Sequence, residues 1–121
     1  MVDCTVYYNP ACSKCRALLA LLDARGIAPR LVDYLQTPPT VEELRRLVDL
    51  FGGDAAQLLR SDMPAYTVLE FGRSEPGADE IVAALHRFPA LLQRPVIVRG
   101  NQALIARPPE SALDLFRDSH G

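Results

Sequence analysis

Two cysteines separated by two residues are the feature of this sequence best suited to chemistry. They form the motif Cys12-Ser13-Lys14-Cys15 in a chain of 121 residues whose third cysteine is Cys4. Without a secretory signal, this spacing is typical of metal binding or thiol redox chemistry. A structural zinc site needs four ligands, and the chain adds only Cys4, His86 and His120. We therefore expect redox chemistry and no metal.

Cys12 is the predicted nucleophile because of its place in a predicted helix over 13–25, which Gly26 ends. The apolar face of this helix has helical spacing and consists of Cys15, Leu18, Leu19 and Leu22. At a helix N-terminus, free N–H groups and the helix dipole stabilise a thiolate. Lys14 and Arg16 add positive charge, which solvent screens.

The other two cysteines have different predicted roles. Cys15 lies one helical turn after Cys12 on the same face, so we expect it to be buried, less reactive and able to act as a resolving thiol. The alternative is that both are incidental packing residues of the helix. Cys4 stands in the middle of a predicted strand and is interpreted as a small core residue.

The elements around the motif predict an α/β fold with a small mixed sheet, in the order β-α-β, a helical stretch, β-β-α. Strands are predicted from β-branched and aromatic runs at 2–8, 30–34, 96–98 and 103–105. The segment 61–76 is poorly patterned.

Four further helices are predicted after the second strand. Thr40 and Glu43 form a capping box for a helix that stops at Gly52-Gly53. Asp54 is predicted to cap a short helix reaching Arg60. The last two helices are 77–88, with Ile81, Val82 and Leu85 inward, and one opened by Pro108-Pro109, with Leu113 and Phe116 facing the core.

The composition argues against a nucleic-acid-binding protein and against a membrane-spanning one. The 13 basic residues are scattered among 15 acidic ones, giving a net charge of −2, so no nucleic-acid surface is expected. The apolar runs are shorter than the roughly 18 residues of a membrane span, and no signal peptide begins the chain. We expect a cytoplasmic, soluble, monomeric protein with one domain over 1–121.

Five motifs together resemble one family, the glutaredoxin-coupled arsenate reductases, over about 6–116. These motifs are Tyr8-Asn9-Pro10-Ala11-Cys12, Tyr34-Leu35-Gln36-Thr37-Pro38-Pro39, Leu58-Leu59-Arg60, Arg94-Pro95-Val96-Ile97-Val98 and Arg107-Pro108-Pro109-Glu110. The resemblance implies a thioredoxin/glutaredoxin-like fold with a helical insertion at about 40–90.

The resemblance also implies a reaction. Cys12 would attack the arsenic of arsenate or a similar oxyanion held by Arg60, Arg94 and Arg107, and arsenite would leave, a reaction of arsenic detoxification. Glutathione, as co-substrate, and glutaredoxin or thioredoxin would supply electrons, with no tightly bound cofactor. Pro95 is the candidate for the cis proline of this fold.

Two departures from the family pattern leave alternatives open. Tyr8 replaces the family's histidine, and Cys15 replaces a serine, so Cys15 or glutathione is expected to release arsenite. A glutaredoxin-like thiol-disulfide oxidoreductase needs only Cys12, Cys15 and Pro95. A redox-sensing regulator of the Spx type, which binds RNA polymerase, shares the fold and the C-x-x-C motif.

Overall fold

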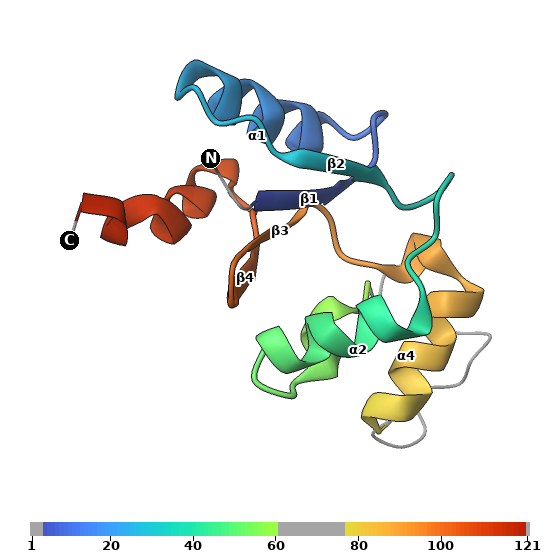
Figure 1. The fold of residues 1–121 in the computed structure, drawn as a ribbon. Coiled ribbons are helices and arrows are strands. Elements are labelled where there is room, and N and C mark those ends of the chain that lie inside the picture. The colour runs from blue at the N-terminus through green and yellow to red at the C-terminus, as the bar shows by residue number, and fades with distance from the viewer. Residues whose placement is uncertain (1–3, 61–76, 121) are drawn as a thin grey trace. The chain divides into compact units, whose positions relative to one another are not determined.

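The computed structural model describes residues 4–60 and 77–120, and the chain divides into two compact units (Figure 1). The first unit comprises residues 1–33 and 94–121, and the second comprises residues 34–93. The predicted helical insertion at about 40–90 falls within the second unit. That the whole chain forms one domain stays a prediction.

The first unit is built on a four-stranded mixed sheet in the order β2-β1-β3-β4. Its strands are β1 (Cys4–Tyr8), β2 (Arg30–Asp33), β3 (Val96–Arg99) and β4 (Gln102–Ile105). β1 pairs with β2 in parallel and with β3 antiparallel, while β3 and β4 form an antiparallel hairpin. The predicted strand order along the chain is therefore correct, with the first strand described from Cys4 onward.

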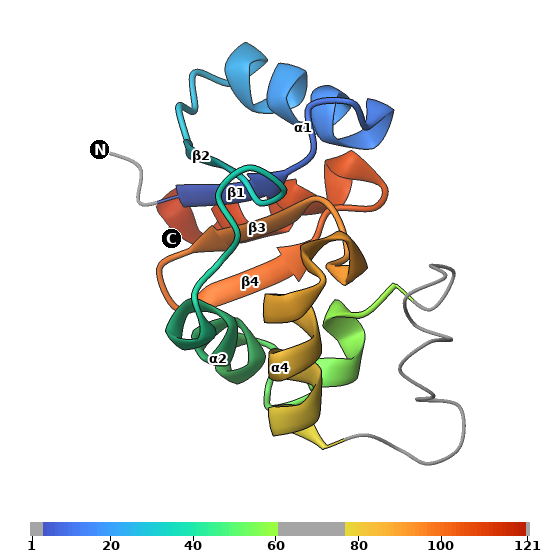
Figure 2. The same cartoon turned by 90° about the vertical axis from the view of Figure 1, so that its right-hand side faces the viewer.

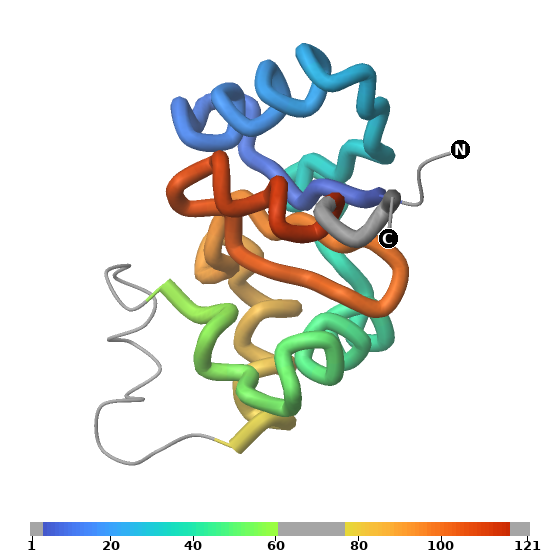
Figure 3. Tube along the Cα trace, turned by 90° about the vertical axis from the view of Figure 1, so that its left-hand side faces the viewer, coloured from blue at the N-terminus to red at the C-terminus, as the bar shows by residue number. Residues whose placement is uncertain are grey.

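Two helical segments pack together beside this sheet, as Figures 2 and 3 show for α1 (Ser13–Ala24) and η4 (Pro109–His120). Side chains from one face of the sheet and from both helices form a single core, which comprises Cys4, Val6, Leu18, Leu22, Ile97, Ala106, Ala112 and Leu115. The burial of Cys4 confirms its interpretation as a core residue. α1 ends where predicted, because Gly26 adopts a left-handed φ of 73° that other residues avoid.

The strand register brings three loops to the edge of the sheet next to α1. Tyr7 pairs with Val96, and Val96 pairs with Ile105. Beyond these pairs, the Ala106 N–H donates to the Pro95 carbonyl at 2.9 Å. The segments that follow β1, precede β3 and follow β4 therefore meet at one edge of the sheet.

The second unit is helical. It contains α2 (Val41–Leu50), η1 (Ala55–Leu58), α4 (Ala78–Arg87) and η3 (Pro89–Leu91). α4 packs against the other three elements, and the predicted inward residues Ile81, Val82 and Leu85 are buried. The capping box of α2 is confirmed, since the Glu43 N–H donates to Thr40 Oγ1 at 3.1 Å and the Thr40 N–H donates to Glu43 Oε1 at 2.9 Å.

Two local predictions are wrong. Asp54 precedes η1 but makes no side-chain cap; its Oδ2 instead accepts a hydrogen bond from Gln57 Nε2 at 3.1 Å. In the last helix Leu113 is half-buried, whereas Ala112 and Leu115 enter the core. Phe116, the other predicted inward residue of this helix, packs partly buried against the same core.

Within the described part of the chain, none of the helices is both long and apolar enough to cross a membrane. The poorly patterned segment 61–76 lies outside the described residues.

Candidate active site

The turn between β1 and α1 sets the position of Cys12. Asn9 Oδ1 accepts a hydrogen bond from the Ala11 N–H at 2.9 Å, and the Asn9 carbonyl accepts one from the Cys12 N–H at 3.0 Å. Pro10 fits this turn because the residue before a proline prefers an extended backbone. Cys12 consequently occupies the N-cap position of α1, with extended φ and ψ of −89° and 124°.

The surroundings of Cys12 favour its thiolate form. Burial by itself would raise the pKa of this thiol, but several groups act in the opposite direction. The N–H of Cys15 and the guanidinium of Arg94 lower the pKa most, and the Cys15 thiol and the N–H of Lys14 lower it further, so the pKa of Cys12 falls to about 7. About half of the molecules then have a reactive thiolate at neutral pH.

Cys15 has the opposite character. Its side chain is fully buried, and burial, together with the neighbouring Cys12, raises the pKa of Cys15 to about 11 although the Asn9 N–H lowers it. That N–H donates to Cys15 Sγ at 3.4 Å. The two cysteine side chains also interact with each other, and all three cysteines are in the free thiol form. The predicted asymmetry between an accessible and a buried thiol is therefore present in the structure.

Arg94 is the cation that the structure brings to Cys12. Its guanidinium lowers the pKa of both cysteines. Two of its nitrogens, Nε and Nη1, are buried and have no hydrogen-bond partner among the described residues. Buried guanidinium donors are energetically unfavourable unless an anion or a water molecule accepts hydrogen bonds from them. The peptide bond between Arg94 and Pro95 is cis, the geometry that the family resemblance implies.

Of the other two predicted arginines, Arg107 belongs to the same unit as Cys12, and Arg60 does not. Arg107 is exposed and follows Ala106, which is hydrogen-bonded to Pro95, so Arg107 lies at the same sheet edge as Arg94. The peptide bond between Arg107 and Pro108 is also cis, which the sequence did not indicate. Arg60 belongs to the second unit, where its N–H donates to the Leu91 carbonyl at 2.7 Å. Its position relative to Cys12 stays a prediction.

The remaining residues near the motif contribute less than the sequence suggested. The side chains of Lys14 and Arg16 are exposed, and it is the main-chain N–H of Lys14 that acts on Cys12. Tyr8, which replaces the family's histidine, packs partly buried against the core of the first unit. Among the residues that the structure describes, no group of three or more acidic, His or Cys side chains is arranged to hold a metal ion.

Asn9 is the residue whose contacts sequence reasoning missed. The dipeptide Asn9-Pro10 indicated a turn, but the contact from the Asn9 N–H to the sulfur of Cys15 joins residues six positions apart. No local pattern in the sequence signals such a contact.

Comparison with known proteins gives the same picture of the fold. A solved arsenate reductase from Vibrio cholerae matches with a TM-score of 0.88 and 40% sequence identity, covering 93% of this chain and 97% of its own. The predicted thioredoxin-like α/β fold with a mixed sheet is thereby confirmed. Two sequence relatives are each 36% identical. The arsenate reductase of Haemophilus influenzae aligns over 92% of this chain and 97% of its own length, and the uncharacterized protein YfgD of Escherichia coli over 91% and 93%.

The family model for the ArsC family matches residues 7–115, which include the C-x-x-C motif, Arg60, Arg94 and Arg107. The chain belongs to the ArsC family, and the family resemblance predicted from the five motifs is confirmed.

Proposed function

We propose that this protein is an arsenate reductase in which Cys12 is the nucleophile and Arg94 holds the oxyanion. The observation that supports the proposal most directly is the pairing of a Cys12 thiol whose pKa is about 7 with a neighbouring Arg94 whose buried Nε and Nη1 have no partner among the described residues. Membership of a family whose relatives are named arsenate reductase supports the same conclusion.

The site suits a tetrahedral dianion. Arginine is charged at all relevant pH values, and its planar fork of donors matches two oxygens of an anion such as arsenate. The first N–H groups of α1 supply further donors beside Cys12. Arg107, at the same edge of the sheet, and Arg60 complete the anion site in this proposal.

The reaction begins with attack of the Cys12 thiolate on arsenic. An S–As bond forms, and one arsenate oxygen leaves as water after taking up protons, so that arsenic is still pentavalent in the adduct. Positive charge from Arg94 and from the start of α1 stabilises the negative charge that the other oxygens keep.

Reduction occurs in the second step. The thiolate of Cys15, or of glutathione, attacks Cys12 Sγ, and the S–As bond breaks with its electron pair remaining on arsenic. Arsenite leaves, and the two sulfurs, which together have lost two electrons, form a disulfide. The proximity of Cys15 to Cys12 favours the internal route, whereas burial, which raises the pKa of Cys15, lowers the fraction of its thiolate.

An external thiol then restores the enzyme. Because the Cys15 side chain is fully buried, glutathione or the cysteine of a glutaredoxin or thioredoxin attacks Cys12, and Cys15 leaves as a thiolate that is then protonated. A second thiol resolves the mixed disulfide. The cycle needs no tightly bound cofactor, and it fits a cytoplasmic, monomeric enzyme supplied with reduced glutathione.

Arsenate-dependent oxidation of NADPH in the presence of glutathione, glutaredoxin and glutathione reductase tests this function. We expect Cys12→Ser to abolish turnover and Arg94→Ala to lower kcat/KM roughly 10- to 100-fold, because a charge-assisted contact to the oxyanion is lost. Arg25→Ala, which removes an exposed arginine at the far end of α1, is the matched control and keeps wild-type turnover. Folded, reduced protein without arsenate-dependent turnover, with either glutaredoxin or thioredoxin as donor, would refute the proposal.

The interaction between the Cys12 and Cys15 side chains favours one other function, glutaredoxin-like thiol-disulfide exchange. That activity needs no oxyanion site. Reduction of insulin or of a mixed disulfide at an unchanged rate in Arg94→Ala, with no turnover of arsenate by the wild type, would select exchange over arsenate reduction.

A further inference from the structure

Asn9 is the residue that connects the two cysteines of the site. Its side-chain oxygen accepts a hydrogen bond from the Ala11 N–H, and its carbonyl accepts one from the Cys12 N–H. In addition, its own N–H donates to Cys15 Sγ at 3.4 Å. One half-buried residue therefore contacts the main chain just before and at Cys12, and also the sulfur of Cys15.

The side chain of Asn9 determines where the Cys12 sulfur lies. Its contact with the Ala11 N–H is an Asx turn, which fixes the backbone of the residues between β1 and α1. Because Cys12 is the N-cap of α1, this turn sets the direction in which its sulfur faces the N–H groups of Lys14 and Cys15. Without the turn, the loop has several backbone conformations available, and the sulfur faces those donors for less of the time.

The main chain of Asn9 acts on Cys15. A fully buried thiolate is strongly disfavoured unless a hydrogen-bond donor compensates for lost hydration. The Asn9 N–H is such a donor, and it acts on Cys15 against the effect of burial. Cys15 must be a thiolate both when it attacks Cys12 and when it leaves the disulfide, so this donor assists both steps.

We propose that Asn9 is the positioning residue of the C-x-x-C pair: its side chain fixes Cys12 at the start of α1, and its main-chain N–H stabilises the sulfur of Cys15 as an internal resolving thiolate. The second part deepens the arsenate reductase function proposed above and depends on it. The first part concerns the free enzyme and holds whether or not arsenate is the substrate.

Thiolate absorbance near 240 nm, recorded against pH for each variant, tests the first part without any substrate. Asn9→Ala removes the Asx turn and should raise the pKa of Cys12 from about 7 to about 8, toward the usual value of about 8.5. The thiolate population at pH 7 then falls about five-fold. Asn9→Ser should restore most of the effect, because a serine hydroxyl accepts the same turn hydrogen bond more weakly. Gln57→Ala, which removes another exposed amide hydrogen bond, should match the wild type.

Mass spectrometry after one turnover with arsenate and limiting glutathione tests the second part. Asn9→Pro removes the main-chain N–H that Asn9→Ala keeps, so the difference between these two variants isolates the contact with Cys15. We expect Asn9→Pro to form about half or less of the Cys12–Cys15 disulfide that Asn9→Ala forms, in favour of glutathionylated Cys12. A wild-type Cys12 pKa in Asn9→Ala would overturn the first part of the inference, and equal disulfide fractions in Asn9→Pro and Asn9→Ala would overturn the second. If the wild type reduces no arsenate while Asn9→Ala still raises the Cys12 pKa, the proposed function fails and the positioning role survives.

Discussion

The reactivity of Cys12 depends on a balance between burial, which favours the neutral thiol, and the donors that favour the thiolate. The donors prevail, and the pKa falls to about 7. At Cys15, one helical turn away, burial outweighs the donors and raises the pKa. In the proposed mechanism, two identical side chains take the different roles of attacking and resolving thiol because their surroundings differ.

Alkylation of Cys12 by iodoacetamide should follow this pKa. Because the thiolate is the reactive form, its fraction and the alkylation rate rise with pH, from about a tenth of the maximum at pH 6 to about half at pH 7 and about nine-tenths at pH 8. The Arg94→Met substitution removes a neighbouring cation, so its profile should shift to higher pH, whereas that of Arg25→Met should not. An inflection near the usual pKa of a free thiol in the wild type would contradict the electrostatic account.

Several site residues were predictable from the sequence because their signals are local. Cys12 at the start of a helix follows from apolar spacing and from Asn9-Pro10, and the burial of Cys15 follows from its place on the apolar face. The selection of Arg94 and Arg107 among many arginines came from the family motifs, since an arginine near a turn has no signal of its own. The contact between Asn9 and Cys15 depends on how β1 and α1 meet in space.

At the scale of elements, α2 shows how a short motif specifies a helix end. Thr40 and Glu43 satisfy each other's main-chain N–H groups, and Glu42 and Glu43 place negative charge in the first turn, where the helix dipole favours it. Both features were predictable, because the pattern Thr-x-x-Glu lies within one turn of the sequence.

Thr40→Ala should destabilise the protein by about 1 kcal/mol, because the Glu43 N–H loses its hydrogen bond to the Thr40 hydroxyl and the capping box of α2 is broken. Urea unfolding followed by far-UV circular dichroism measures the change. Thr40→Ser retains the cap and should be close to the wild type, and Thr37→Ala, an exposed threonine before the helix, is the control. Equal stability of the Thr40→Ala and Thr37→Ala proteins would show that the capping box contributes nothing measurable.

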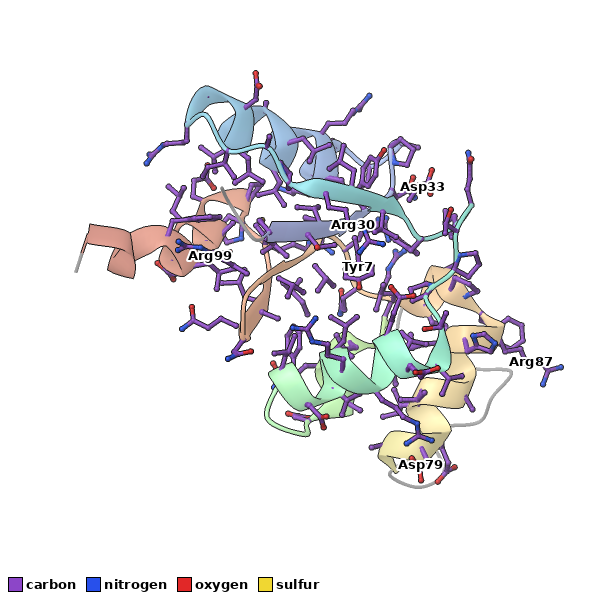
Figure 4. The ribbon with its side chains drawn as sticks, viewed as in Figure 1. Tyr7, Arg30, Asp33, Asp79, Arg87 and Arg99 are labelled. Atoms are coloured by element: carbon purple, nitrogen blue, oxygen red, sulfur yellow. The ribbon has the colours of Figure 1, made fainter. Side chains whose placement is uncertain are left out.

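The last helix shows the limit of prediction from periodicity. Its apolar pattern indicated Leu113 as a core residue, but in the 3₁₀ helix that forms, Ala112 and Leu115 are buried in the core and Leu113 is half-buried. Arg99 lies against this helix in Figure 4, with its guanidinium over the ring of Phe116 at 4.7 Å and a hydrogen bond to the Leu115 carbonyl. Such contacts from β3 help to decide which residues face inward, and they are invisible to a helical pattern.

At the scale of the whole molecule, the order of elements was predictable and the long-range placement was not. Each strand and helix of the first unit follows from local composition, and the sheet order follows from the fold that the family motifs imply. Arg60 belongs to the second unit, residues 34–93, and only the family motifs selected it, because no local rule in the sequence specifies where an inserted unit lies.

The most direct test of the central claim is a single turnover of the reduced, full-length protein with arsenate and no other thiol, with arsenite quantified at the end. The account predicts about one arsenite per chain, formed together with a Cys12–Cys15 disulfide, because these two thiols supply both electrons. Cys12→Ser should give none, and Cys15→Ser should give arsenite only after glutathione is added. If the folded, reduced wild type forms no arsenite either alone or with glutathione, Cys12 is not the nucleophile of an arsenate reductase and the account is wrong.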